Sequence, residues 1–151
     1  MMGRIFTRRL SLIIATYGRP VPLNELLRGC ASLHRPPDEV LIVDQVHEQL
    51  GWSGIAADVV HRFEDKNIPL KLFRLDKLNL PLARNVGTVF SAGDIVLFLD
   101  DDVVLESEIV KCHLGGYIDS TTVSVAGRLL ENPNWPRSTD ESNFLPLAPF
   151  S

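Results

Sequence analysis

The pattern of apolar and polar positions along the chain alternates between short apolar runs and segments with helical spacing. Nearly unbroken apolar runs are typical of strands that are covered on both faces. They predict strands at residues 10–15, 40–44, 68–75, 94–100 and 123–130. The third of these is expected to begin at Pro69, because proline is accepted at the first position of a strand.

The segments between these runs predict helices. Their apolar residues recur at helical spacing over residues 23–33, 55–63, 80–93 and 106–118. Pro20 and Pro81 lie near two of the predicted starts, Gly93 near one end, and Gly115 and Gly116 should end the last helix early. In the second helix Ile55, Val59 and Phe63 share one face. Strand–helix alternation of this kind predicts an α/β fold with a mostly parallel sheet flanked by helices.

An open parallel sheet binds ligands at the carboxyl ends of its strands. Polar residues follow three of the predicted strands there: Thr16–Arg19, Asp44 and Gln45, and the triplet Asp100–Asp102. The candidate chemistry of this protein therefore collects at one edge of the predicted sheet.

The three consecutive aspartates allow three interpretations. They are an acidic loop that caps the following helix, a pair of carboxylates that share a proton, or ligands of a hard divalent cation such as Mg²⁺ or Mn²⁺. An apolar pair, Val103 and Val104, follows the triplet and looks like the start of a helix. A cation would remove the repulsion between the carboxylates, and the residues alone leave all three interpretations open.

Composition narrows the class of protein. The chain has 151 residues, 45% of them hydrophobic and 23% charged, which is typical of one globular domain. Its net charge of −4 argues against a nucleic-acid partner. No apolar stretch approaches the roughly 20 residues of a membrane span. Cys30 and Cys112 are far apart, which predicts free thiols in a reducing compartment, hence a cytoplasmic and at most membrane-peripheral protein.

Three segments carry a family resemblance. In order and spacing the chain resembles the nucleotide-sugar-binding half of family 2 inverting glycosyltransferases, in the segments LSLIIATYGRP, EVLIVDQ and LPLARNVGTVFSAGDIVLFLDDDV. The last segment is the most specific, with an ARN-x-G helix, an A-G-D turn, an apolar strand and an aspartate triplet. The resemblance covers about residues 10–130 and implies a GT-A type fold that binds a nucleotide-diphospho-sugar donor, with a UDP-sugar as first guess.

The resemblance also implies roles for individual residues. The D-x-D motif would be Asp100, Asp101 and Asp102, with Asp102 on a Mn²⁺ or Mg²⁺ ion and Asp100 near the ion or the ribose. The positions expected to bind the nucleotide-sugar are Ala15, Tyr17, Arg19, Asp44, Arg84, Asp100 and Asp101. Among these, Asp44 would accept a hydrogen bond from the base and Tyr17 would lie near it. Gly18 departs from the family, which often has asparagine there.

The implied reaction needs a general base that takes the proton of an acceptor hydroxyl. In the family this base lies well beyond the D-x-D motif, in the part that binds the acceptor. Asp140 and Glu141 fall too early to match it. We therefore expect an N-terminal tail at residues 1–9, a nucleotide-sugar-binding domain at 10–130, and a proline-rich tail at 131–151 that begins a missing acceptor part. The acceptor itself is an unknown saccharide, lipid or protein.

Two other functions remain open. One is a non-catalytic nucleotide-binding module, in which the aspartates hold no ion. The other is a nucleotidyltransferase on a similar fold, although the first strand is followed by a single glycine instead of a glycine-rich phosphate loop. The scattered histidines His34, His47, His61 and His113 are expected to be non-catalytic.

Overall fold

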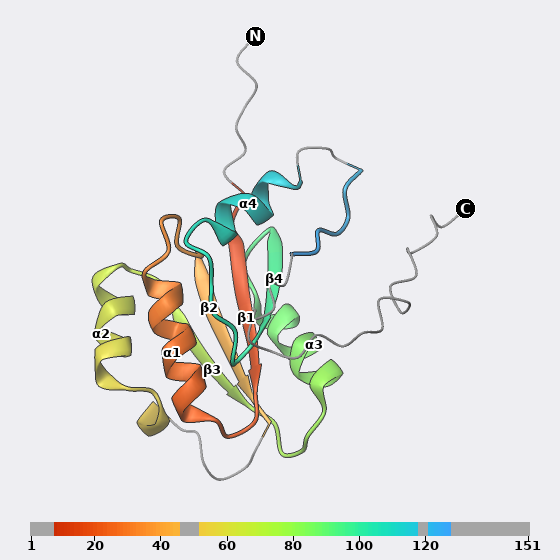
Figure 1. Cartoon of the computed structure of the whole chain (residues 1–151). Coiled ribbons are helices and arrows are strands. Elements are labelled where there is room, and N and C mark those ends of the chain that lie inside the picture. The colour runs from red at the N-terminus through yellow and green to blue at the C-terminus, as the bar shows by residue number, and fades with distance from the viewer. Residues whose placement is uncertain (1–7, 46–51, 118–120, 128–151) are drawn as a thin grey trace, which may run out of the picture.

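Four parallel strands form the sheet in the part of the chain that the computed structural model describes, residues 8–45, 52–117 and 121–127. They are β1 (Leu10–Thr16), β2 (Glu39–Asp44), β3 (Leu70–Arg74) and β4 (Ile95–Asp100), in the spatial order β3-β2-β1-β4 (Figure 1). The strands β1 and β2 are central and almost wholly buried. The predicted α/β fold with a mostly parallel sheet is confirmed.

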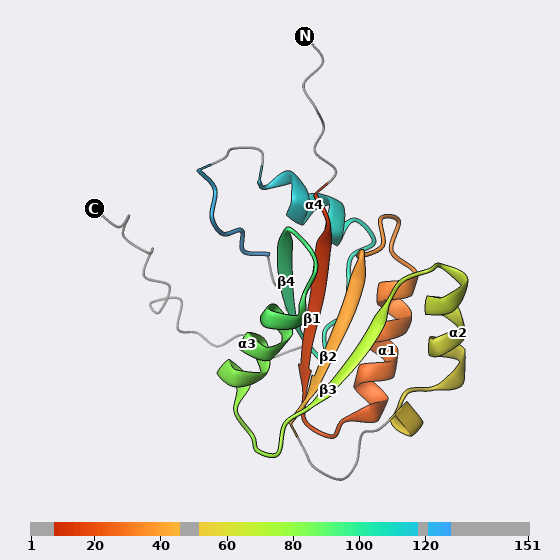
Figure 2. The same ribbon diagram turned by 180° about the vertical axis from the view of Figure 1, so that it is seen from behind.

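Helices cover both faces of the sheet. Figures 1 and 2 show α1 (Pro20–Ala31), α2 (Ala57–Asp65) and α4 (Ile109–Gly115) on one face and α3 (Leu80–Phe90) on the other. A short 3₁₀ helix, η1 (Trp52–Gly54), precedes α2. The main core lies between the sheet and the first set of helices, and its fully buried members include Leu12, Ile14, Leu23, Leu27 and Val59.

The sequence pattern located these helices well. Pro20 is in the first turn of α1, where a missing N–H costs nothing. Val59 and Phe63 are buried on one face of α2, as predicted, whereas Ile55 is buried but precedes the helix, which begins at Ala57. The strand β3 starts directly after Pro69, and α4 ends at Gly115 as expected.

Three predictions of local structure were wrong. Residues 103–106 are not helical, and α4 begins only at Ile109. The helix α3 ends at Phe90 instead of Gly93, because residues 92 and 93 turn to approach β1. Residues 123–127 form no strand, since nothing in the described part of the chain pairs with them, and Val123 is 93% exposed.

Several expectations fall outside the described residues. These are His47, the tail at 131–151 with Asp140 and Glu141, most of the tail at 1–9, and the end of the predicted strand at 123–130. Among the helices that are described, none is long and apolar enough to cross a membrane.

Candidate nucleotide-sugar site

The loop between β1 and α1 is shaped by one glycine. Gly18 has a φ of 56°, a left-handed conformation that glycine and asparagine adopt more readily than other residues. Its N–H donates a hydrogen bond of 3.1 Å to Oδ1 of Asp44. The loop that carries Tyr17 and Arg19 is thus tied to the end of β2.

Asp44 is fully buried at that strand end. The register of the sheet places it opposite Thr16. Its Oδ1 accepts from Gly18, while its Oδ2 has no hydrogen-bond partner within the described structure. Buried carboxylate oxygens are normally satisfied, so this atom lacks a donor that a bound molecule can supply.

The three aspartates after β4 point in different directions. The side chains of Asp100 and Asp102 are 65% and 52% exposed, whereas that of Asp101 is 6% exposed. Oδ2 of Asp101 accepts from the Thr16 hydroxyl at 2.5 Å, and Oδ1 accepts from Arg19 at 2.9 Å. The first and third carboxylates therefore face solvent, while the middle one fastens β4 to β1.

Each of these carboxylates is paired with an arginine. Arg19 bridges Asp101 and Asp102, with 3.1 Å from Nη1 to Oδ2 of Asp102. Arg84 lies 3.4 Å from Oδ1 of Asp100. Among the described residues, each carboxylate thus contacts an arginine and not another carboxylate. This argues against a pair of carboxylates that share a proton. The capping interpretation is wrong, because α4 begins seven residues beyond the triplet (109 − 102) and its N-cap is Glu108.

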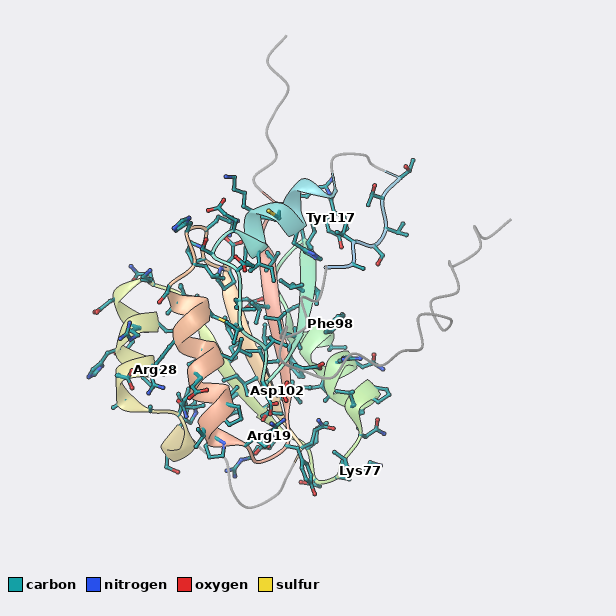
Figure 3. All side chains as sticks on the ribbon, viewed as in Figure 1. Arg19, Arg28, Lys77, Phe98, Asp102 and Tyr117 are labelled. Carbon is teal, nitrogen blue, oxygen red and sulfur yellow. The ribbon has the colours of Figure 1, made fainter. Side chains whose placement is uncertain are left out.

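A pocket of about 240 Å³ lies at this edge of the sheet. Figure 3 shows Arg19 and Asp102 close together there, at the end toward which the strands point. The lining residues are Ala15, Thr16, Tyr17, Arg19, Gln45, Asp100, Asp101 and Asp102. Asp44 and Arg84 do not line the pocket and contact lining or loop residues instead.

Thr16 and Gln45 line the pocket; the sequence placed them at the strand ends, but no binding role was predicted for them. Thr16 holds Asp101, and the buried Gln45 accepts a hydrogen bond from the Asn79 N–H at 2.9 Å through its Oε1. Asn79 in turn caps α3, accepting from the Leu82 N–H. Both lining residues directly follow apolar strands, and that position was the available signal.

Two close approaches set the position of α3 and β4. A Cβ on Gly87 would overlap Cγ2 of Ile13, so only glycine lets α3 pack this closely on β1. A Cβ on Gly93 would lie 2.5 Å from Oγ of Ser11. The glycines of the ARN-x-G helix and the A-G-D turn therefore have packing roles. Gly87 lets α3 pack closely on β1, and α3 places Arg84 near Asp100.

Comparison with known proteins agrees with this geometry. The model of the family described as glycosyl transferase family 2 matches residues 11–148. The chain belongs to glycosyltransferase family 2. A curated relative from Haemophilus influenzae, named an uncharacterized glycosyltransferase, is 24% identical over 119 residues, which are 78% of this chain and 46% of the relative.

Solved structures give the same assignment of the fold. The S. aureus TarS 1–349 structure has a TM-score of 0.56 at 26% identity and covers 71% of this chain and 31% of its own. A second TarS 1–349 structure, in complex with UDP-GlcNAc, is 25% identical, with a TM-score of 0.54 over 71% of this chain and 30% of that one. The mannosyltransferase PcManGT from Pyrobaculum calidifontis, in complex with GDP-Man and Mn²⁺, is 20% identical with a TM-score of 0.63, over 78% and 34% of the two chains. The predicted GT-A type fold is confirmed, and the chain spans less than half the length of these relatives.

The pocket of this family 2 member fits a divalent cation only in part. No group of three or more His, Cys, Asp or Glu side chains able to hold a metal occurs in the described residues. Asp100 and Asp102 nevertheless present two exposed carboxylates at one pocket. Magnesium-type ions are commonly held by one or two carboxylates plus waters and substrate phosphates, so this donor set fits an ion completed by a diphosphate.

The described histidines lie away from the pocket. His34 pairs with Glu108 at 2.5 Å, and His61 pairs with Glu64 at 3.4 Å. His113 is buried on α4 beside Tyr117, and this burial lowers the pKa of its imidazole. None of the three lines the pocket.

Proposed function

We propose that this family 2 member takes part in the transfer of a sugar from a nucleotide-diphospho-sugar to an acceptor hydroxyl, with inversion and with a divalent cation. The observation that carries the proposal is the opposite orientation of neighbouring aspartates at the pocket. Asp100 and Asp102 face solvent, and Asp101 is buried between β4 and β1. A helix cap or a solvated acidic loop would not require that alternation.

The proposed donor lies across the carboxyl edge of the sheet. Asp44 accepts an N–H of the base, for which its unpartnered Oδ2 is the supporting observation. Tyr17, which is 52% exposed at the pocket, offers an aromatic face to the same base. Arg84 contacts the nucleotide from α3, and Ala15 lines the pocket opposite Asp100 in the sheet register.

The chemical contribution of the chain is positional and electrostatic. Asp100 and Asp102 would hold a Mn²⁺ or Mg²⁺ ion, which acts as a Lewis acid on the leaving nucleoside diphosphate when bound. The inward Asp101 fixes the strand end that carries both ligands, through Thr16 and Arg19. We place the general base and the acceptor-binding part outside the described residues.

Uracil is the proposed base. An acceptor such as a carboxylate oxygen suits bases that present a ring N–H, which uracil, thymine and guanine do and cytosine does not. The TarS structure in complex with UDP-GlcNAc, at 25% identity, supports uracil among these.

A non-catalytic nucleotide-binding module is the second candidate. It is favoured by one observation, namely that the described residues hold no group of three or more His, Cys, Asp or Glu side chains that could bind a metal ion. Such a module would bind the donor and transfer nothing. Both candidates share the donor site, so binding and transfer must be measured separately.

The test is calorimetric titration of the full chain with UDP, GDP and TDP, in Mn²⁺ and in chelator, beside Asp102→Ala. Manganese-dependent binding of one nucleotide that the substitution abolishes supports the donor site, whereas absence of binding in all conditions rejects it. Release of UDP from UDP-sugars in the presence of mixed acceptors then separates the enzyme from the module.

A further inference from the structure

One nitrogen of Arg19 contacts two carboxylates, one of them buried and the other half exposed. Its Nη1 lies 2.9 Å from Oδ1 of Asp101 and 3.1 Å from Oδ2 of Asp102. Arg19 comes from the loop before α1, and the two aspartates follow β4, 82 and 83 residues later in the chain. Figure 3 shows Arg19 and Asp102 next to each other at the carboxyl edge of the sheet.

The two contacts are unequal. Asp101 is buried and is also held by the Thr16 hydroxyl, so its geometry is fixed from two sides. Asp102 is half exposed, and Arg19 is its only partner within the described residues. Exposed ion pairs contribute little free energy, so the contact with Asp102 breaks more easily than the contact with Asp101.

We propose that Arg19 is an internal counter-ion of Asp102, which a divalent cation must displace, and that the displaced guanidinium then contacts the donor's diphosphate. The inference rests on the proposed function, because it concerns how the same pocket loads its ion. The cation and Oδ2 of Asp102 attract each other, while the cation and the nearby guanidinium repel. Arg19, still held by Asp101, keeps a half-exposed charge at the pocket, where phosphate oxygens are suitable partners.

The proposal requires effects of opposite sign from one substitution. Arg19→Gln removes the charge but keeps a hydrogen-bond donor for Asp101. Without the competing charge, Mn²⁺ alone should bind about three- to tenfold more tightly. With saturating Mn²⁺, UDP should bind about three- to tenfold more weakly, because a charged contact to the diphosphate is lost.

The experiment titrates the full chain with Mn²⁺ alone, with free Mn²⁺ measured by electron paramagnetic resonance, and then with UDP by calorimetry. Arg19→Lys keeps the charge and should stay near the wild type in the first titration. Arg28→Gln is the matched control, because Arg28 forms a similar exposed pair with Asp58, away from the pocket. Thermal melting of each variant confirms that it is folded, and Arg19→Met, which also removes the charge, takes the place of Arg19→Gln if the latter is not.

Tighter Mn²⁺ binding and weaker UDP binding in Arg19→Gln, with neither change in Arg28→Gln, support the inference. Unchanged or weaker Mn²⁺ binding in Arg19→Gln overturns it, even if UDP binding depends on Mn²⁺ and the proposed function stands. Absence of Mn²⁺ binding by every variant overturns the inference together with the metal part of the proposed function. If UDP still binds in chelator, the donor site is intact although the inference and the metal part of the proposed function have both failed.

Discussion

Gly87 of α3 lies against Ile13 of β1 so closely that a Cβ on the glycine would overlap Cγ2 of the isoleucine. The helix that presents Arg84 to Asp100 is therefore seated by direct contact of its backbone with a central strand. The same glycine belongs to the ARN-x-G segment through which the sequence resembles its family. A residue that touches no ligand thus contributes to the site by its lack of a side chain.

Gly87→Ala should destabilise the fold despite the better helix propensity of alanine. Overpacking costs about 1–3 kcal/mol, while alanine gains about 1 kcal/mol in a helix. Gly29→Ala in α1 is the control, because nothing lies within 4 Å of its added Cβ, and it should be neutral or stabilising. Urea unfolding should place the two variants about 1–3 kcal/mol apart. Equal unfolding free energies would mean that α3 shifts on β1 without cost.

The aspartate triplet should divide into one structural residue and two binding residues. Asp101→Ala leaves Arg19 and Thr16 without their buried acceptor, so it should lower the free energy of unfolding by about 1–3 kcal/mol. Asp100→Ala and Asp102→Ala remove exposed side chains and should change it by no more than about 1 kcal/mol. Urea unfolding of the three variants measures the difference.

The same variants should show the reverse order in binding. Asp102→Ala and Asp100→Ala should each weaken manganese-dependent UDP binding about tenfold or more, because each removes a proposed ligand of the ion. If instead Asp101→Ala alone abolished binding while remaining fully stable, the assignment of inward and outward aspartates to structure and binding would be wrong.

The sequence was sufficient to predict which loops meet at one pocket but not to orient their side chains. Nearly unbroken apolar runs predicted β1, β2 and β4, and the rule that parallel sheets bind at their carboxyl edge then pointed to loops that line the pocket. Three identical aspartates carry no signal of which one points inward. That choice depends on the Thr16 hydroxyl and Arg19, more than 80 residues earlier in the chain.

The wrong local predictions share one cause. Val123 and Val125 have the alternation of a strand, and Val103 and Val104 look like the start of a helix, yet periodicity says nothing about available partners. In the described structure no strand pairs with the first pair, and Val104 is 99% exposed. Likewise, the role of Gly93 appeared only once the register had brought its turn against Ser11.

Asp44 should select the base. Its unpartnered Oδ2 can accept the ring N–H of uracil, whereas the ring nitrogen of cytosine at that position is itself an acceptor. UDP should therefore bind more tightly than CDP, by about 1–3 kcal/mol or roughly 5- to 150-fold. In Asp44→Asn an amide that can donate replaces the acceptor, so the preference should shrink or reverse.

Calorimetry with both nucleotides measures this preference. Asp58→Asn, an exposed carboxylate on α2, is the control and should keep the wild-type ratio. Equal affinity of the wild type for UDP and CDP would show that Oδ2 of Asp44 does not face the base.

His113 should make the fold less stable in mild acid. Burial lowers the pKa of its imidazole below the ordinary value of 6.5. The unfolded chain therefore takes up a proton in a pH range where the folded chain does not, and stability falls as the pH drops through 6.5. His113→Phe removes the titration and retains an aromatic ring beside Tyr117, so it should flatten the dependence between about pH 5 and 7.

Urea midpoints at several pH values measure the slope for His113. The exposed His61 provides the control, and His61→Gln should leave the slope of the wild type unchanged. An identical slope in His113→Phe would assign the dependence to other groups.

Glu39 should stabilise the opposite end of the sheet above pH 5. It is 5% exposed at the start of β2, and its desolvation, which raises the pKa, is outweighed by hydrogen bonds from the Ala92 N–H, from Lys71 at 2.6 Å and from Ser11 at 2.6 Å. The net shift of its pKa is downward from the ordinary value of 4.5. The carboxylate therefore contributes its full stabilisation above pH 4.5, and that contribution is lost as the pH falls through the lower folded pKa.

Glu39→Gln should cost about 1–3 kcal/mol at pH 7, since Lys71 and the Ala92 N–H lose a charged acceptor. The difference from the wild type should shrink between about pH 5 and 3, because protonation removes the same charge from the native side chain. Glu64→Gln, at an exposed carboxylate on α2, is the control and should follow the wild type throughout. A constant gap between Glu39→Gln and the wild type down to pH 3 would show that the side chain acts through packing. A gap that closes would show that the charge on Glu39 holds the A-G-D turn against β2. This turn also brings Gly93 against Ser11 and directly precedes β4.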